Sequence, residues 1–493
     1  MRIALLPPDE RPNTAGYART VGAACDVEVL LPPPETMPSF HRPADTAALA
    51  GWLRDIAPEV DHAVVSLDLL VHGGLIPSRN TPDRIGDVLP RLEALRQLQV
   101  PVTAYQVVTR LPHYDNASRS RQEPAYWATH GAALGRLSTA WDEHAHGEID
   151  ADAVAAARAA VPAEHVADLV RRRLRNHVVN LAALELAADG GLETLAITSD
   201  DTAPRGLPAA DRRALAAWID RLGVDVLTYP GADEVPSVLV ARVAAQAAGV
   251  VPRVAVRCPA RGGLERVAPY EDRPVAVGFA NQVRAVGGTL VDDPADADLV
   301  VVLHAPATET GDWVMAPPQQ DSRADAELVV AEVGDQLGRG RPVAVADVRY
   351  ANGSDPTLLR ELDRARLLGR LVSYGGWNTA GNTIGTTLAA GVAWLLGRSP
   401  GAAAAREGFL ARKIVEDGHY LPVVRAQLQA EAVARGLLDP PVEELPAVED
   451  RITRELDDWA RGVDALAGYR VREARLPWGY TFTVDFRLER RLA

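Results

Sequence analysis

Six aspartates stand at or directly after short apolar runs of the chain: Asp9, Asp68, Asp200, Asp201, Asp233 and Asp347. A carboxylate beside a buried run needs a partner, a proton or a metal, because burying an isolated charge is costly. Glycoside cleavage uses such groups in pairs, one protonated and one charged. We take Asp200 or Asp201 as one candidate catalytic carboxylate and Asp9 or Asp68 as the other, with Asp233 and Asp347 as candidate substrate-binding residues.

Hydrogen-bond donors and one aromatic ring accompany these carboxylates. Amide and guanidinium groups suit sugar hydroxyls, and the C–H face of a sugar ring packs on an aromatic side chain. Trp377 is the candidate aromatic platform, and a plug between domains is an equally good interpretation of this Trp between Gly and Asn. The candidate substrate-binding donors are Arg11, Asn13, Arg79, Arg110, Asn352, Asn378 and Asn382.

The elements that must position these residues are strands alternating with helices. Continuous apolar runs occur at residues 3–6, 27–31, 63–67, 102–108, 194–198, 226–229 and 253–257, and then at 275–279, 299–304, 343–346 and 371–373. Stretches with helical periodicity lie between them, at 45–56, 84–98, 211–222, 235–248 and 321–337. This alternation predicts an α/β fold with parallel βαβ units. Since the carboxyl ends of parallel strands meet at one rim, we expect the candidate residues to face one cleft.

The chain divides into three predicted regions. Residues 1–260 predict a parallel β/α barrel-like domain, residues 261–400 a smaller open α/β domain of Rossmann-like type, and residues 401–493 a mainly helical region with a final strand or edge hairpin over 478–486. Gly-rich and Pro-containing loops at 261–263 and 397–401 mark the two boundaries.

Composition excludes several classes of protein. The 493-residue chain has a net charge of −14, which argues against nucleic acid or an anionic membrane as the partner. No apolar run approaches the ~18 residues of a membrane helix, and the first run is too short for a signal peptide, so we expect a cytoplasmic protein. Two cysteines, Cys25 and Cys258, exclude a disulfide framework.

Cofactor motifs are absent from the sequence. No Gly-rich loop followed by Lys and no Gly-x-Gly-x-x-Gly after a strand occurs, so we expect no organic cofactor. The single lysine, Lys413, lies in a stretch that predicts an ordinary amphipathic helix rather than a Schiff-base site.

Several motifs form a pattern when they are taken together: residues 6–13 (Leu-Pro-Pro-Asp-Glu-Arg-Pro-Asn), 66–68 with 73–74, 78–79, 175–177 with 180, 199–201, 229–234 and 376–383. With these motifs the chain resembles the bacterial domain-of-unknown-function family 4127, from the first strand to about residue 480. It departs from the family pattern at Glu10 and Ser199, where the family has Asp and Gln or a similar residue. Asp9 and Asp200 are therefore the better candidates. The resemblance implies no activity.

The chemistry predicts hydrolysis of a glycoside or related polyhydroxylated small molecule by a carboxylate pair. One alternative is a Mg²⁺- or Mn²⁺-dependent hydrolase, with oxygen ligands from Asp9, Asp68, Asp200 and Asp347. Zinc is disfavoured because the rim lacks His at metal-ligand spacing. A second alternative is a protein that binds a sugar or acidic metabolite without turnover.

Overall fold

The computed structural model describes residues 1–40, 42–111, 113–115, 123–200, 202–306, 311–315, 317–318 and 321–491. The chain forms two compact units. The N-terminal unit comprises Arg2–Glu10 and Leu30–Ala232, and the C-terminal unit comprises Met1, Arg11–Val29 and Asp233–Ala493. The early segment Arg11–Val29 thus belongs with the second half of the sequence. The predicted boundaries near residues 260 and 400 stay a prediction.

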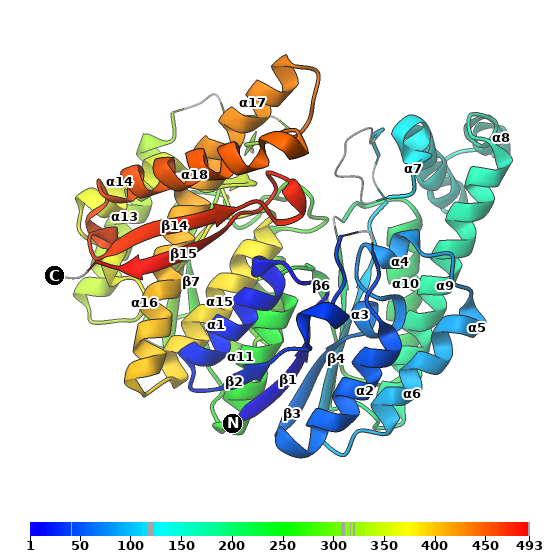
Figure 1. Ribbon diagram of the computed structural model, residues 1–493, viewed down its shortest axis with the longest axis horizontal. Coiled ribbons are helices and arrows are strands. Elements are labelled where there is room, and N and C mark those ends of the chain that lie inside the picture. The colour runs from blue at the N-terminus through cyan, green and yellow to red at the C-terminus, as the bar shows by residue number, and fades with distance from the viewer. Residues whose placement is uncertain are drawn as a thin grey trace. The chain divides into compact units, whose positions relative to one another are not determined.

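The N-terminal unit is built around a six-stranded parallel sheet (Figure 1). Its strands are ordered β2-β1-β3-β4-β5-β6, with bounds β1 (Arg2–Leu6), β2 (Glu28–Leu30), β3 (His62–Ser66), β4 (Val102–Val108), β5 (Thr194–Ser199) and β6 (Val226–Pro230). The pairings β1·β3, β3·β4, β4·β5 and β5·β6 are all parallel. Strands β3, β4 and β5 are buried along their whole length, as helices on both faces of a sheet require.

The three longest helices of this unit all follow β4. The helices of the unit are α2 (Thr46–Ile56), α3 (Leu67–His72), α4 (Pro77–Asn80), α5 (Ile85–Val88), α6 (Glu93–Arg96), α7 (Trp127–Ala145), α8 (Ala151–Ala159), α9 (Ala163–Ala188) and α10 (Leu207–Leu222). The single helix expected over 84–98 is wrong: α5 and α6 are separated by a 3₁₀ turn, Leu89–Leu92. Pro90 stands in that turn, where its missing N–H and fixed ring disfavour a continuous α-helix.

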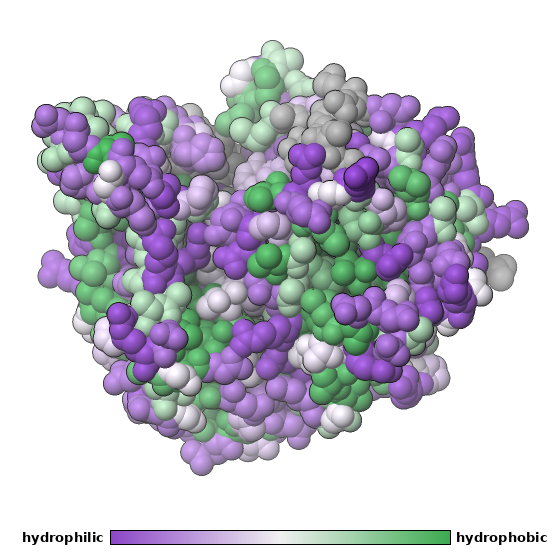
Figure 2. Space-filling view, turned by 180° about the vertical axis from the view of Figure 1, so that it is seen from behind, coloured by the Kyte–Doolittle hydropathy of each residue, from purple (hydrophilic) through white to green (hydrophobic). Residues whose placement is uncertain are grey.

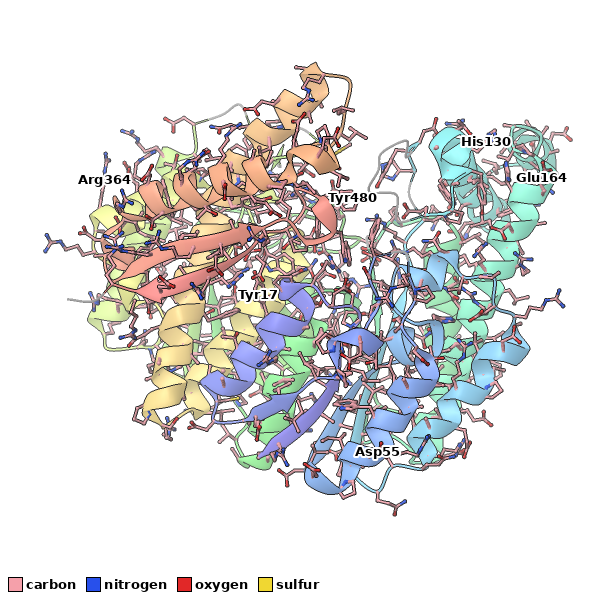
Figure 3. All side chains as sticks on the ribbon, in the orientation of Figure 1. Tyr17, Asp55, His130, Glu164, Arg364 and Tyr480 are labelled. Atoms are coloured by element: carbon pink, nitrogen blue, oxygen red, sulfur yellow. The ribbon has the colours of Figure 1, made fainter. Side chains whose placement is uncertain are left out.

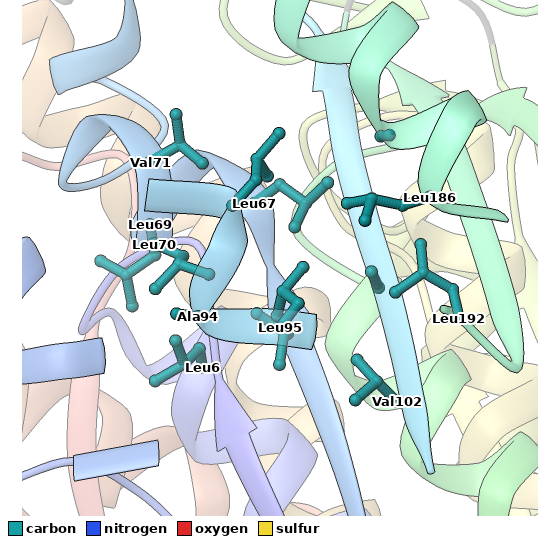
Figure 4. Packing of buried hydrophobic residues seen from close by; sticks show 14 of the residues in the cluster. Leu6, Leu67, Leu69, Leu70, Val71, Ala94, Leu95, Val102, Leu186 and Leu192 are labelled. Carbon is teal, nitrogen blue, oxygen red and sulfur yellow. The ribbon is translucent and has the colours of Figure 1, made fainter. Parts of the chain in front are cut away.

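Helix α3 anchors the core of the N-terminal unit. Its residues Leu67, Leu69 and Leu70 share one buried cluster with Leu95 and Leu186 (Figure 4). Full burial of each such side chain contributes roughly 1.5–3 kcal/mol. The helix begins at an N-cap, where the Ser66 hydroxyl accepts a hydrogen bond from the Leu69 amide, and it ends before a left-handed glycine. An acidic residue within this helix is consequently held in apolar surroundings.

The C-terminal unit has its own parallel sheet in the order β13-β11-β9-β7-β8. Its strands are β7 (Arg253–Arg257), β8 (Thr289–Leu290), β9 (Leu299–His304), β11 (Val343–Asp347) and β13 (Ser373–Gly375), and smaller ladders pair β10 (Gly311–Asp312) with β12 (Tyr350–Ala351) and β14 (Tyr469–Arg475) with β15 (Asp485–Arg490). Its α-helices are α1 (Tyr17–Ala24), α11 (Val235–Ala247), α12 (Val275–Ala285), α13 (Arg323–Gly338), α14 (Pro356–Arg364), α15 (Ala380–Leu396), α16 (Pro400–Val415), α17 (Ala426–Ala434) and α18 (Leu445–Ala460). Two segments are π-helical: Pro12–Gly16 leads into α1, and Glu416–Arg425 joins α16 to α17.

The α/β class with parallel sheets is confirmed, whereas closure of the first sheet into a barrel stays a prediction. The strand expected at 275–279 is wrong, because these residues open helix α12. In that helix Val275, Phe279 and Val283 lie at i, i+4 and i+8 and are buried, so one helical face accounts for the apolar residues. The expected final strand is displaced: β15 begins at Asp485, beyond a 3₁₀ turn at Pro477–Gly479.

One face of the protein carries both hydrophilic and hydrophobic residues (Figure 2). Hydrophilic residues occupy much of the face in Figure 2, with hydrophobic residues in smaller patches between them. Among the helices that the structure describes, none has both the length and the apolar character that crossing a bilayer demands.

Candidate functional site

Two arginines and two carboxylates form a cluster of ion pairs near the carboxyl ends of β4 and β5 in the N-terminal unit. Arg79, on α4, donates hydrogen bonds to Asp200 and, at 3.5 Å, to Glu123 Oε1. Arg110, two residues after β4, places its Nε 3.4 Å from the same Glu123 oxygen and 4.0 Å from Asp200 Oδ2. Because each cation faces both acids, the four side chains hold one another in fixed orientations. We call Arg79, Arg110, Glu123 and Asp200 the rim cluster.

A pocket borders the rim cluster. The pocket is partly open to solvent. Besides Arg79, Arg110 and Glu123 of the cluster, Arg172, Arg173 and the rings of Tyr126 and Trp127 line it. Arg172 is held by Asp168 at 2.7 Å and Arg173 by Asp211 at 2.8 Å. The wall therefore combines oriented guanidinium groups with aromatic surface.

Asp68 is a buried neighbour of the rim cluster. It lies on α3 with 1% of its surface exposed, and its Oδ2 accepts a hydrogen bond of 2.9 Å from the Val107 amide. Burial raises the pKa of Asp68 to about 7; the charge of Asp200 adds to this shift, while the Val107 amide and Arg79 oppose it. Asp68 can thus carry a proton near neutral pH, next to an acid that is bound by a guanidinium.

The other two predicted catalytic aspartates have different situations. Asp9 is buried in the loop after β1, in the same unit as Asp68 and Asp200, and its charge contributes to the raised pKa of the buried Tyr105. Asp201 lies outside the described residues.

A second arginine–carboxylate contact joins predicted binding residues of the C-terminal unit. Arg11 binds Asp233 through two hydrogen bonds of 2.7 and 3.1 Å, and the Asn13 amide donates to the same carboxylate at 2.8 Å. The Arg11 guanidinium also lies 4.8 Å from the ring centre of Trp478 and 5.7 Å from that of Phe482. Such a bidentate pair fixes the position of both side chains.

Asp347 ends β11 inside a buried network. Its Oδ2 accepts from the Asp355 amide at 2.6 Å, and its Oδ1 accepts from the Arg349 amide at 3.3 Å. Asp355 in turn lies 3.0 Å from His304 Nε2, at the end of the neighbouring strand β9. Burial raises the pKa of Asp347 to about 6, with His304 opposing the shift and Asp355 adding to it.

The remaining predicted residues lie on loops and a helix start of the C-terminal unit. Asn352 and Asn378 both adopt left-handed backbone angles (φ 64° and 53°). The backbone N–H of Asn352 donates to the backbone carbonyl of Asn378 at 2.8 Å. Trp377 is 4% exposed and packs edge-on against Tyr17, with ring centres 6.0 Å apart. Asn382, in the first turn of α15, donates to Thr379 at 3.2 Å.

A buried lysine is the feature that sequence reasoning missed in this unit. Lys413 is fully buried; its Nζ lies 2.9 Å from Asp417 Oδ1 and donates to the Tyr17 hydroxyl at 3.2 Å. Tyr17, on α1 (Figure 3), donates to Glu416. The predicted helix is present, but its lysine belongs to a buried charge network. That this is the single lysine of the chain was the available signal.

Glu123 was missed in the N-terminal unit. It follows no strand directly, since fourteen residues separate it from the end of β4. The unusual length of this connection was the available signal, because long loops at the carboxyl ends of strands carry function. Asp68 and Asp200 are brought together within one unit, and Asp347 lies in the other; the single cleft expected for all candidates stays a prediction.

Comparison with known proteins gives one finding. A family described as "Protein of unknown function (DUF4127)" matches residues 3–487. Neither the curated proteins nor the solved structures give a match. Within the part of the chain that the structure describes, no three His, Cys, Asp or Glu side chains come together as ligands for a metal ion.

Proposed function

Because the chain belongs to the family described as a protein of unknown function (DUF4127), its activity must be inferred from its site, and we propose that it is a hydrolase of glycosides or related polyhydroxylated compounds. The observation that carries the proposal is the rim cluster: two carboxylates, oriented by two arginines, beside a pocket with aromatic walls. A small carbohydrate-like substrate and a cytoplasmic location belong to the same proposal.

The two acids of the proposed reaction are Asp200 of the rim cluster and the neighbouring Asp68, and they differ in their surroundings. Asp200, bound by Arg79 and partly exposed, acts as the charged carboxylate toward the substrate. Asp68, buried and with its pKa raised to about 7, keeps the proton that the acid step requires. Acid–base hydrolysis of glycosides uses one protonated and one charged carboxyl group.

The pocket supports binding of a polyhydroxylated molecule. Guanidinium N–H groups of Arg110, Arg172 and Arg173 are donors for hydroxyl oxygens, and the Glu123 carboxylate is an acceptor for hydroxyl protons. Tyr126, which is partly exposed, offers ring surface for the C–H face of a sugar, and the buried Trp127 packs behind it. The metal-dependent alternative has no such support, since the described acidic residues form no ligand group.

The first prediction concerns Asp200. Replacing it as Asp200→Asn keeps the shape of the side chain and removes its charge, so we expect kcat/KM on a panel of aryl glycosides to fall at least about 100-fold, with folding retained. Turnover is measured from the released aglycone, and folding by the melting temperature.

Asp189→Asn is the matched control. Asp189 forms an exposed ion pair with Arg96 at 3.3 Å in the same unit, so its loss should leave turnover unchanged. Full activity of Asp200→Asn would remove this residue from the mechanism. If the wild-type protein is stabilised by a sugar of the panel but releases no aglycone, the protein is a binding protein and the hydrolase proposal is wrong.

A further inference from the structure

Arg425 is a buried cation with almost no acceptors. It ends the π-helical segment Glu416–Arg425 and is 6% exposed. Its only hydrogen bond within the described residues is a long one of 3.4 Å from Nη1 to Asn352 Oδ1, and its buried Nε has no partner there. No described carboxylate lies within ion-pairing distance of it. Burial lowers the pKa of Arg425, and the charges of Tyr420 and Asp312 oppose this shift.

Two other buried arginines of this protein, Arg175 and Arg349, have at least two acceptors each. Arg175, 1% exposed, donates to the carbonyls of Ser78, Thr81 and Asp83 and to Asn176. Arg349, 2% exposed, is bound by Asp325 and Tyr350. Burying a guanidinium without such partners costs free energy. The lack of acceptors at Arg425 therefore needs a reason other than stability.

One edge of the Arg425 guanidinium has no hydrogen-bond acceptor among the described residues. Nη1 faces Asn352, whose amide nitrogen donates to Asp312 at 3.1 and 3.2 Å. Asp312 is itself occupied, because Tyr270 and the Val314 and Met315 amides also donate to it. Nε and Nη2, on the other edge, have no acceptor among the described residues. That edge presents two parallel N–H groups, the geometry that binds two oxygens of a carboxylate or phosphate.

Aromatic surface adjoins the same guanidinium. The ring centre of Phe482 lies 5.4 Å from the Arg425 guanidinium carbon and 5.7 Å from that of Arg11. The charge of Arg11 is balanced by the carboxylate of Asp233, which it binds through two hydrogen bonds. Arg425 has no carboxylate partner among the described residues. An anionic group is thus directed to Arg425 and not to Arg11.

We propose that Arg425 anchors an anion-binding site of the C-terminal unit, which takes the carboxylate or phosphate group of a small molecule on the Nε–Nη2 edge. The ligand oxyanion supplies the two acceptors and the negative charge that the chain does not provide. Phe482 packs against the part of the ligand next to the charged group. The inference does not depend on the proposed hydrolase activity, which concerns residues of the N-terminal unit.

The test measures binding in the full chain at constant ionic strength. Glucuronate and inorganic phosphate are the two probes, and glucose is the uncharged comparison. We expect one or both anions to raise the melting temperature of the wild type in a saturable way, and glucose to have no such effect. Glucuronate and phosphate responses distinguish a carboxylate from a phosphate ligand.

Arg425→Met is the diagnostic variant. It removes an unpaired buried charge while keeping apolar bulk, so the free protein should melt at the same or a higher temperature than the wild type. The anion should bind at least about 30-fold more weakly, because the charge-assisted contact is lost. Arg425→Lys, which keeps the charge but not the two-pronged edge, provides a second variant in case the first does not fold.

Arg435→Met is the control for net charge. Arg435, at the end of α17, forms an exposed ion pair with Glu444 at 2.7 Å, so this variant should bind the anion as the wild type does. The proposal is overturned if neither anion stabilises the wild type. It is also overturned if wild type and Arg425 variants respond equally, or if Arg435→Met loses the response as well.

Discussion

Burial decides the protonation of individual carboxyl groups in this protein. Asp68, Asp347 and Asp417 all have pKa values raised to between about 6 and about 7, and in each the largest cause is the loss of water around the charged form. Each keeps one or two backbone N–H donors, which orient the group but do not offset its desolvation. Asp68 and Asp347 are thus held as proton carriers near neutral pH, whereas Asp417 is paired with Lys413 at 2.9 Å.

Asp68 gives a pH-dependent prediction. Its folded pKa of about 7 exceeds the ordinary value, so the folded state binds more protons between about pH 4 and 7 and stability falls as the pH rises through that window. Asp68→Asn keeps an acceptor for the Val107 amide and removes this loss. We expect the free energy of unfolding of the variant, relative to the wild type, to be larger at pH 8 than at pH 5 by on the order of 2–3 kcal/mol.

Urea unfolding at the two pH values checks this prediction. Asp298→Asn is the control of opposite sign, because hydrogen bonds from Arg253 lower the pKa of Asp298. Its stabilising contribution is present above the ordinary pKa of aspartate, so its loss should cost nearly the same at pH 5 and pH 8. An equal effect of Asp68→Asn at both pH values would show that burial does not raise its pKa.

At the scale of elements, the change from α16 to the π-helical segment builds the Lys413 network. Lys413 lies in the last turn of α16 and Asp417 in the first turn of the π-helical segment, and the two groups meet at 2.9 Å across this junction. Asp417 also accepts from the Gly376 amide at 2.8 Å, which ties the loop after β13 to the junction. π-helical turns often occur at functional sites. Here the turn places a charged pair among the rings of Tyr17 and Trp377.

Lys413→Met should therefore destabilise the C-terminal unit. The variant leaves Asp417 buried without its cation, which typically costs about 3–5 kcal/mol. Adding Asp417→Asn removes the unpaired charge, so the double variant should recover part of this loss. Denaturant unfolding of the wild type, Lys413→Met, Asp417→Asn and the double variant measures the coupling free energy between the two side chains. Additive losses in the double variant would show that the two side chains do not act as a pair.

At the scale of the whole molecule, the two structural units are not continuous in the sequence, because the early segment Arg11–Val29 belongs to the C-terminal unit. Helix α1, near the start of the sequence, packs with α11, α15 and α16 of the C-terminal unit. Its end is fastened there too, because Asp26 accepts from the Arg398 and Ser399 amides at 2.6 and 3.1 Å. Gly397 allows this approach, since a Cβ at that position would lie 2.2 Å from the Ala24 carbonyl oxygen.

The chain beginning at Asp233 should consequently not fold well by itself. Without residues 11–29 it lacks the buried Tyr17, Ala18 and Val21 and exposes the helix faces that cover them. We expect the fragment 233–493 to bind 1-anilinonaphthalene-8-sulfonate and to melt without a cooperative transition. Added peptide 11–29 should restore cooperativity, whereas a scrambled peptide should not. A cooperative transition of the fragment alone would contradict the unit boundaries.

The sequence by itself determined the class of the fold and the parts of the chain that carry polar groups. Continuous apolar runs alternating with helical stretches are local patterns, and for this reason the parallel α/β class and most strands were predictable. The strand expected at 275–279 failed because a short apolar run does not reveal its period, and helix α12 satisfies it as well. The position of Asp200 and Asp68 near strand ends was predictable for the same local reason.

Only the tertiary structure decided how these groups are paired and buried. The contact of Arg79 with Asp200 joins residues 121 positions apart, and that of Tyr17 with Lys413 joins residues 396 positions apart. Desolvation depends on all neighbouring atoms, so the raised pKa of Asp68, the burial of Lys413 and the unmatched charge of Arg425 follow from packing and not from spacing along the chain.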